Sequence, residues 1–286
     1  MSIFYRQIRT MGTRLEIVIP GIAEPEGLDL TRGISQRMED MVGQISNYDP
    51  ESDLSKVNRE ATDHAVEVNG YLLELIEAGI RFNKETLGYY DFTLGGWSSR
   101  PDLIRDTGKR FELLHNIPFN ERFSLEGTSL RFLHKDVRID SGGIGKGMAL
   151  KVIEKMIHEL EIPTAFISFG GSSVLGIGNH PHGDGWKVGI QHPQMSDRTL
   201  SEVTIFNQSI SVSGNSMNNR KKYGEQGHII NPMDGGFYMA QGVISVVAEN
   251  PVVAEVLSTA LTVAGEEHEK QILSHFEDVL VQRHEI

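Results

Sequence analysis

A glycine-rich segment at residues 140–147, with the sequence DSGGIGKG, is the densest feature that could bind a ligand. It lies between a predicted strand and a predicted helix, where glycines let the backbone approach a ligand and free N–H groups face an anion. It is not a P-loop, because Gly147 rather than Ser or Thr follows Lys146, and its glycines lack the Rossmann spacing. The residues alone leave two interpretations open, an anion-binding loop and a tight strand–helix turn.

Two later segments carry side chains suited to acid–base or metal chemistry. His228 precedes a turn-forming IINPMDG stretch, and imidazole is suited to general-base work near neutral pH. Glu255 and Thr259 are four residues apart in a predicted helix and share one face, where their oxygens could bind Mg²⁺. The residues alone also allow simpler interpretations. His228, one of eleven histidines, could be an ordinary surface residue, and Glu255 and Thr259 could be a pair on the helix surface with Thr259 packed inward.

Three tyrosines in predicted loops, Tyr48, Tyr89 and Tyr90, could stack on a planar ring. Aromatic side chains in loops also seal hydrophobic cores, so composition does not decide between these roles.

The elements that must position these residues are mixed helices and strands. Hydrophobic spacing predicts helices near residues 26–46, 71–85, 148–160 and 251–264. The first 20 residues are typical of a hairpin that turns near residues 11–13. Further strands are predicted near 122–125, 129–133, 137–140, 165–169, 173–177, 186–190, 202–206, 210–213 and 241–248. Because short turns link most successive strands, we expect an α+β fold with largely antiparallel sheets, and one large domain over residues 1–286.

Composition excludes several classes of function. The chain has 286 residues, 27 Lys and Arg against 39 Asp and Glu, and a formal charge of −12, which disfavours general binding to nucleic acid or anionic membranes. With no cysteine, disulfides, thiolate nucleophiles and iron–sulfur clusters are excluded. No membrane span, signal peptide or lipidation site is seen, so the cytoplasm is the expected location, although a chain trimmed at its start would look the same.

The order of these motifs along the chain carries more information than each motif alone. Nine of them, in sequence, resemble the FAD:protein FMN transferase family, also known as the thiamine-biosynthesis lipoproteins. They are MGT at residue 11, the S-x-Y and S-x-L-S-x-x-N segment at 46–58, YDFTLG at 90–95 (family F-D-x-T-V-G), DSGGIGKG at 140–147 (D-L-G-G-I-A-K-G), GG at 170, WKVGIQHP at 186–193, SG at 213, HIINPxxG at 228–235 and AEVLSTA at 254–260 (A-D-A-L-S-T-A).

The resemblance implies a function, a cofactor set and a site. Family members use FAD and Mg²⁺ to transfer FMN to a Ser or Thr hydroxyl of an acceptor flavoprotein, with release of AMP. FAD would bind in a cleft between the halves of the domain, and His228 would be the general base. The residues that would line the FAD site are Met11, Tyr48, Tyr89, Tyr90, Asp91, Asp140, Lys146 and Ile230. The residues that would hold the metal are Gly143 through its carbonyl oxygen, Glu255, Thr259 and also Ser258.

Three positions depart from the family pattern. Glu255 replaces the metal-binding Asp and is one methylene longer, while Asn231 and Ser172 each replace an Asp. Because Mg²⁺ requires near-ideal octahedral geometry, the longer Glu255 could alter its affinity. The sequence therefore leaves two alternatives to transfer, an Mg²⁺-dependent FAD pyrophosphatase that forms FMN and AMP, and a non-catalytic FAD-binding protein.

Overall fold

A large antiparallel sheet forms the centre of the computed structural model, which describes residues 2–95, 114, 116–195, 197–214, 229–236, 238 and 242–286. Among these residues its strand order is β1-β2-β6-β7-β10-β11-β12, and neighbouring strands are antiparallel throughout. The strands are β1 (Ile3–Thr10), β2 (Thr13–Pro20), β6 (Ala165–Phe169), β7 (Ser173–Ile177), β10 (Gln208–Gly214), β11 (Gly242–Ala248) and β12 (Leu280–Glu285). This arrangement confirms the predicted α+β class with antiparallel sheets.

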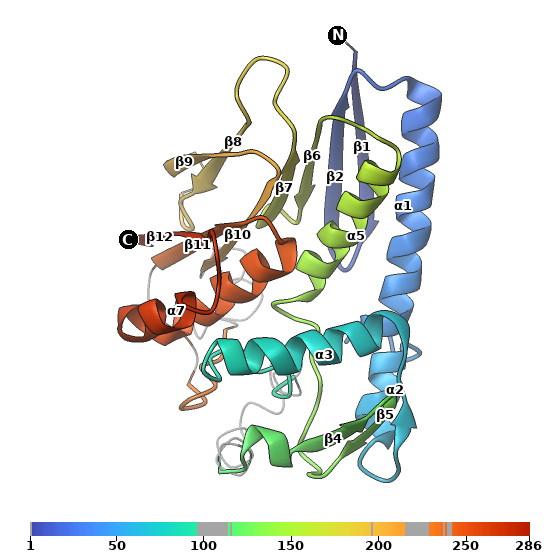
Figure 1. Ribbon diagram of the computed structural model, residues 1–286, viewed down its shortest axis with the longest axis vertical. Helices are drawn as coiled ribbons and strands as arrows, with labels where there is room; N and C mark the ends of the chain where they lie inside the picture. Colours follow the sequence, from blue (N-terminus) through green and yellow to red (C-terminus); the bar gives the residue numbers. More distant parts are fainter. Residues whose placement is uncertain are drawn as a thin grey trace.

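Three helices pack on one face of this sheet, as Figure 1 shows. They are α1 (Glu24–Ile45), α5 (Gly145–Glu159) and α7 (Pro251–Leu273). Alternate residues of β2, namely Leu15, Ile17 and Ile19, are buried in one cluster with Ile34 and Met38 of α1. The buried residues of the strand, spaced by two, and those of the helix, spaced by three to four, therefore pack in the same core.

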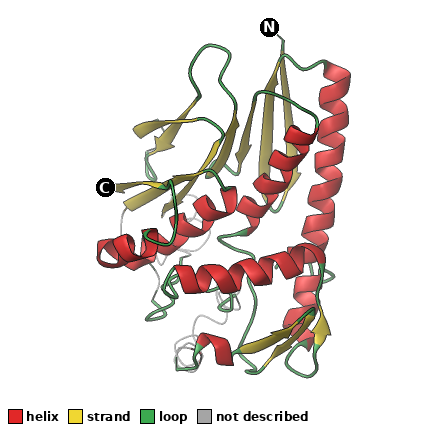
Figure 2. Cartoon of the chain, in the orientation of Figure 1, coloured by secondary structure: helices red, strands yellow, loops and turns green. Residues whose placement is uncertain are grey.

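The remaining elements extend the molecule at two places. Helices α2 (Asp53–Glu60) and α3 (Gly70–Glu85) follow α1 and lie next to a small sheet (Figure 2). The strands of this sheet, in spatial order, are β3 (Val66–Glu67), β5 (Ser129–Phe132) and β4 (Phe123–Glu126). A short 3₁₀ turn, η2 (Phe119–Glu121), precedes β4. The hairpin of β8 (Trp186–Gln191) and β9 (Thr199–Ile205) packs Trp186 and Ile205 against Val174 and Ile210 of the large sheet. No helix in the described ranges is long and apolar enough to cross a membrane.

Two predicted elements differ in the structure. The strand expected at 137–140 does not join a sheet, because its backbone hydrogen bonds go to residues 92–95 and to the side chain of Asn58. The last helix continues beyond residue 264 to Leu273, with a kink at Gly265, whose φ of 66° interrupts the helical backbone. β12 was not predicted, because its mostly polar sequence forms a strand only by pairing with β11.

Helices α5 and α7 approach each other closely at Gly147. A Cβ atom added there would lie 2.7 Å from the backbone oxygen of Pro251 and 2.8 Å from the Cα of Val252. Because both atoms belong to the backbone, neither can move without shifting α7. The glycine thus lets the start of α5, with Lys146, lie directly against the first turns of α7.

We predict that Gly147→Ala lowers the free energy of unfolding by about 1–3 kcal/mol through overpacking, measured by urea denaturation. The matched control is Gly43→Ala in α1, where an added Cβ meets nothing within 4 Å. That change should stabilise the protein by up to about 1 kcal/mol, because alanine has the higher helix propensity. Equal effects of both substitutions would contradict the proposed close approach.

Candidate functional site

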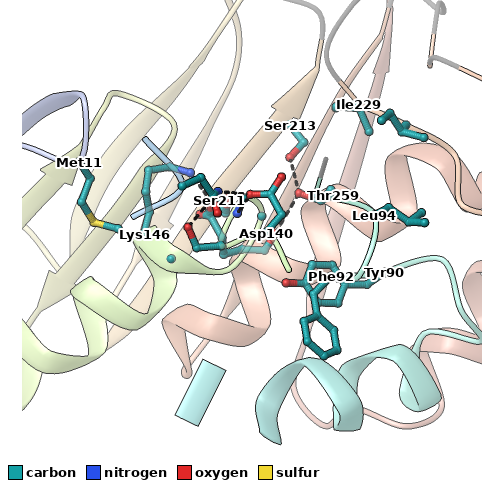
Figure 3. A pocket seen from close by; sticks show the side chains of 18 of the residues that line it. Met11, Tyr90, Phe92, Leu94, Asp140, Lys146, Ser211, Ser213, Ile229 and Thr259 are labelled. Carbon is teal, nitrogen blue, oxygen red and sulfur yellow. Dashed lines mark hydrogen bonds and ion pairs between the residues drawn. The ribbon is translucent and has the colours of Figure 1, made fainter. Parts of the chain in front are cut away.

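A pocket of about 650 Å³ lies where the end of α1, the 140–146 loop, β10 and α7 meet (Figure 3). Residues predicted to bind FAD line it from five separate segments of the chain. They are Met11, Tyr48, Tyr89, Tyr90, Asp91, Asp140, Lys146 and Ile230. Three predicted metal ligands, Gly143, Glu255 and Thr259, also line it. Residues far apart in sequence therefore share one cavity, while their individual roles remain predictions.

One predicted metal ligand, Ser258, is not among the described residues that line this cavity. Ser258 is fully buried, and its hydroxyl bonds to those of Ser213 at 2.9 Å and Ser211 at 3.1 Å. It would therefore act on a metal only through these neighbours. His228 lies outside the described residues.

The 140–146 loop joins an extended segment to the start of α5, and its shape depends on local hydrogen bonds. Asp140 Oδ1 accepts hydrogen bonds from the backbone N–H of Gly142 at 2.7 Å and from the side-chain amide of Asn47. Gly143 has a φ of 72°, in the left-handed region that favours glycine, and a Cβ there would lie 3.3 Å from Thr259 Oγ1. The loop is therefore both a tight turn and a wall of the pocket, so the two sequence interpretations are compatible.

Asn58 holds the segment before this loop. Its side-chain amide donates to the Ile139 carbonyl at 2.9 Å and accepts from the Ile139 N–H at 2.8 Å. This pair of bonds replaces a neighbouring strand for Ile139. The last residue of the S-x-L-S-x-x-N motif thus orients Asp140 without entering the pocket wall.

The buried carboxylate of Glu255 is at the centre of the site and is 3% exposed. Lys146 Nζ pairs with its Oε1, while Ser173 and Ser211 donate to its Oε2, the latter at 3.0 Å. Burial alone would raise the pKa of Glu255, but the Lys146 ammonium and the hydroxyl donors outweigh it and hold the pKa below its ordinary value. Glu255 is therefore ionised at neutral pH.

Serines on alternate positions of β10 complete this polar wall. Ser211 contacts Glu255, and Ser213 Oγ lies 3.5 Å from Thr259 Oγ1, so both face α7. The sequence analysis did not include these two serines in the site, because a polar residue at every second position of a strand is also typical of a solvated face. Their period of two would have identified them only if the position of α7 had been known.

The oxygen atoms around Thr259 fit a hard divalent cation in their chemistry. The hydroxyls of Thr259 and Ser213 and the backbone of Gly143 are close together, and Mg²⁺ prefers oxygen ligands supplemented by substrate phosphates. Glu255 fits less directly, because both its oxygens are already bonded, and it would have to exchange Lys146 for the metal. Within the described residues no cluster of three or more His, Asp or Glu side chains could hold a metal.

Asp91 lines the pocket, but its carboxylate is bonded within the protein. Its Oδ2 accepts from Arg122 Nη1 at 2.5 Å, and its Oδ1 accepts from the backbone and hydroxyl of Thr93 at 2.9 and 2.6 Å. Both charged side chains are nearly fully buried. No sequence pattern indicated a role for Arg122, which is a single basic residue before a short strand. Asp91 is thus anchored to Arg122, and what it contributes to the pocket is the shape of the wall.

The three tyrosines differ in what they offer a ligand. Tyr48 is 73% exposed at the mouth of the pocket, whereas Tyr90 is 4% exposed. Tyr89 is partly buried, and its hydroxyl lies 3.1 Å from His268 Nδ1. Only Tyr48 and Tyr89 therefore present ring surface on which a flat ligand could stack.

Comparison with known proteins points to one family. The ApbE family matches residues 11–281. A curated FAD:protein FMN transferase of Vibrio cholerae serotype O1 is 28% identical over 272 residues, covering 90% of this chain and 80% of the relative. One of Chlamydia muridarum is 29% identical over 240 residues, covering 78% of this chain and 72% of the relative.

Solved structures show the same fold. Flavin transferase ApbE from Vibrio cholerae has a TM-score of 0.82 and 24% identity, covering 98% of this chain and 92% of that one. The ApbE protein of Thermotoga maritima has a TM-score of 0.78 and 21% identity, covering 98% and 94%. The antiparallel α+β architecture is therefore shared with these proteins.

We predict that Lys146→Met lowers the free energy of unfolding by about 2–3 kcal/mol, because it leaves the Glu255 carboxylate buried without its ammonium partner. This expected loss of stability is at or below the usual value for a broken buried ion pair, because the Lys146 side chain is 29% exposed and water partly screens its charge. The double variant Lys146→Met/Glu255→Gln should recover most of the loss in urea denaturation.

The exposed pair Lys187–Glu202, 3.3 Å apart, provides the control. Lys187→Met should change the stability by less than about 0.5 kcal/mol. If the double variant were no more stable than Lys146→Met, the charge of Glu255 would not be the cause.

Proposed function

Since this chain belongs to the ApbE family, we propose that it transfers the FMN moiety of FAD to a Ser or Thr hydroxyl of an acceptor flavoprotein and releases AMP. Relatives named FAD:protein FMN transferase align with most of its length. The observation that carries the proposal is that one pocket brings together the predicted nucleotide and metal residues from segments as far apart as Met11 and Thr259. The proposal treats residues 1–286 as one catalytic domain.

The reaction replaces the phosphoanhydride bond of FAD by a phosphate ester bond. The acceptor hydroxyl oxygen forms a bond to the phosphorus of the FMN half, and the bond from this phosphorus to the bridging oxygen breaks. The bridging oxygen leaves with AMP, and the hydroxyl proton is transferred to a base. His228, at the position of the family's general base, is the residue proposed to accept it.

The chain's own residues bind and orient the two halves of FAD. Tyr48 and Tyr89 would contact flat rings, while Lys146 and the start of α5 present positive charge toward the diphosphate. A bound Mg²⁺ would neutralise the phosphate oxygens, which is the main requirement for phosphoryl transfer. Gly143, Thr259 and Glu255, with Ser258 behind them, would hold it. This local positive charge suits an acidic protein that binds an acidic substrate.

The Lys146–Glu255 ion pair favours a second candidate, a non-catalytic FAD-binding protein. Because this pair neutralises Glu255 without a metal, FAD could bind without a metal ion in the site. A pyrophosphatase differs from the transferase only in using water in place of the acceptor hydroxyl.

One experiment separates these functions. The protein is incubated with FAD, Mg²⁺ and an acceptor flavoprotein, and the acceptor is weighed by mass spectrometry while AMP is quantified. Transfer predicts covalent FMN on the acceptor and AMP in equal amount. AMP and free FMN without an acceptor would identify a hydrolase, and FAD binding with no AMP under any metal would identify a binding protein.

We predict that His228→Ala abolishes covalent transfer, with at least a hundredfold loss on the scale typical of general-base removal, while the Kd for FAD stays close to that of the parent. The matched control is His64→Ala, because the His64 side chain lies in the turn after α2 and is 62% exposed. That variant should transfer FMN at the parent rate. Transfer by His228→Ala at the parent rate would disprove the base assignment.

Thr259→Ala should raise the Mg²⁺ concentration for half-maximal AMP release by about tenfold, because a hard oxygen donor is removed from the proposed metal site. Thr262→Ala, one turn later on α7, is the control, since Thr262 bonds only to the Ser258 carbonyl at 2.7 Å. An unchanged Mg²⁺ dependence in Thr259→Ala would place the metal elsewhere.

A further inference from the structure

The buried hydroxyl of Tyr90 has no hydrogen-bond partner among the residues that the structure describes. Among the described residues only three buried side-chain polar atoms are in this position, Tyr90 OH, Asn47 Oδ1 and Ser245 Oγ. The first two belong to residues of the pocket wall. A buried polar atom without a partner costs about 1–3 kcal/mol, so proteins retain few of them without a reason. Because two of these three unpartnered atoms belong to residues of one pocket, they are candidates for hydrogen bonds to a ligand.

The ring of Tyr90 is buried, and its backbone is held by two hydrogen bonds. It packs edge-on against Phe82, with ring centroids 6.4 Å apart. The backbone of Tyr90 donates to Thr86 Oγ1 at 3.0 Å and accepts from Asn83 Nδ2 at 2.9 Å. Because the ring is 4% exposed, it cannot serve as a stacking platform for a flavin or an adenine. What it offers to the pocket is a hydroxyl in a fixed position.

That hydroxyl lies near the atoms proposed to hold the diphosphate and its cation. A Cβ built on Gly143 would lie 3.4 Å from Tyr90 Cε2 and 3.3 Å from Thr259 Oγ1, so the tyrosine and the threonine flank the same glycine. Figure 3 shows Tyr90 on the side of the pocket where Asp140 and Thr259 lie, away from Met11. We call this side of the cavity, which Gly143, Ser213 and Thr259 line, its polar floor.

The charges around the hydroxyl determine what it does. Burial, followed by the carboxylates of Asp140, Asp91 and Glu255, raises the pKa of Tyr90 well above its ordinary value. A phenol with its ordinary pKa of about 10 already keeps its proton at neutral pH, so the hydroxyl is available as a donor. It needs an oxygen acceptor that approaches from the cavity.

We propose that the Tyr90 hydroxyl is a ligand-binding group that donates a hydrogen bond to a charged or cation-bound oxygen at the floor of this pocket. The oxygen is either a phosphate oxygen of the dinucleotide or a water molecule of its Mg²⁺. This inference rests on the proposed function for the identity of the ligand. The hydroxyl is also a feature of this chain beyond the family motif quoted above, which has Phe at this position.

Tyr90→Phe tests the proposal, because it removes one oxygen and keeps the ring. The Kd for FAD in the presence of Mg²⁺, measured by calorimetry, should rise about tenfold or more, as for a lost hydrogen bond to a charged group. The Tm of the ligand-free variant should equal or exceed that of the parent, because an unsatisfied buried group is removed. A purely structural hydroxyl would produce the opposite pattern, a lower Tm with an unchanged Kd.

Further arms identify the oxygen. If the acceptor is a phosphate oxygen, the loss of FAD affinity persists in EDTA, whereas a water of the cation predicts a loss only with Mg²⁺. Riboflavin, which has no phosphate, should bind parent and variant equally. Ser245→Ala is the matched control, since it removes a buried hydroxyl without a partner from β11, outside the pocket wall, and should leave the Kd for FAD unchanged.

The outcomes are distinct from those that test the transferase reaction. An equal Kd for FAD in Tyr90→Phe and parent, with and without Mg²⁺, would overturn the inference and indicate a buried water as the partner. A fall in Tm of the ligand-free variant, or an equal loss of FAD affinity in Ser245→Ala, would overturn it as well. Failure of the parent to bind FAD at all would instead reject the proposed function.

Discussion

The site depends on one buried negative charge. The carboxylate of Glu255 on α7 contacts Lys146 of α5, Ser173 of β7 and Ser211 of β10, so four elements converge on it. Burying a charge is unfavourable unless its partners are placed well. The close approach of α5 to α7 at Gly147 satisfies this condition, and the same approach brings the 140–146 loop to the pocket. The electrostatics of Glu255 and the shape of the cavity are therefore coupled.

Around this charge the pocket is divided into two kinds of surface. On one side the hydroxyls of Ser213 and Thr259 and the backbone of Gly143 form an oxygen-rich floor suited to a cation and to phosphates. At the mouth, the exposed Tyr48 provides aromatic surface. This division matches a ligand that is charged in the middle and flat at its ends, as FAD is.

Several parts of the site were accessible from sequence, and others were not. The glycine segment, the Glu255–Thr259 pair and the tyrosines could be recognised because their residue types and spacing carry chemistry. Arg122 could not, because its role depends on Asp91, which is 31 positions away in the chain. The distinction between Tyr48 and Tyr90 was also hidden, since packing alone leaves one tyrosine ring exposed and buries the other.

By itself the sequence determined the α+β class, most helices and strands, the family resemblance and the residue types at the site. Those properties depend on local periodicity and on motif order, which a linear chain displays. Only the tertiary structure decided that residues 137–140 bond to a loop and to Asn58, that Glu255 already has Lys146 as its counterion, and that the Tyr90 hydroxyl has no partner in the described part of the chain. Each of these is a relation between distant segments, and burial and hydrogen bonding exist only once those segments are packed together.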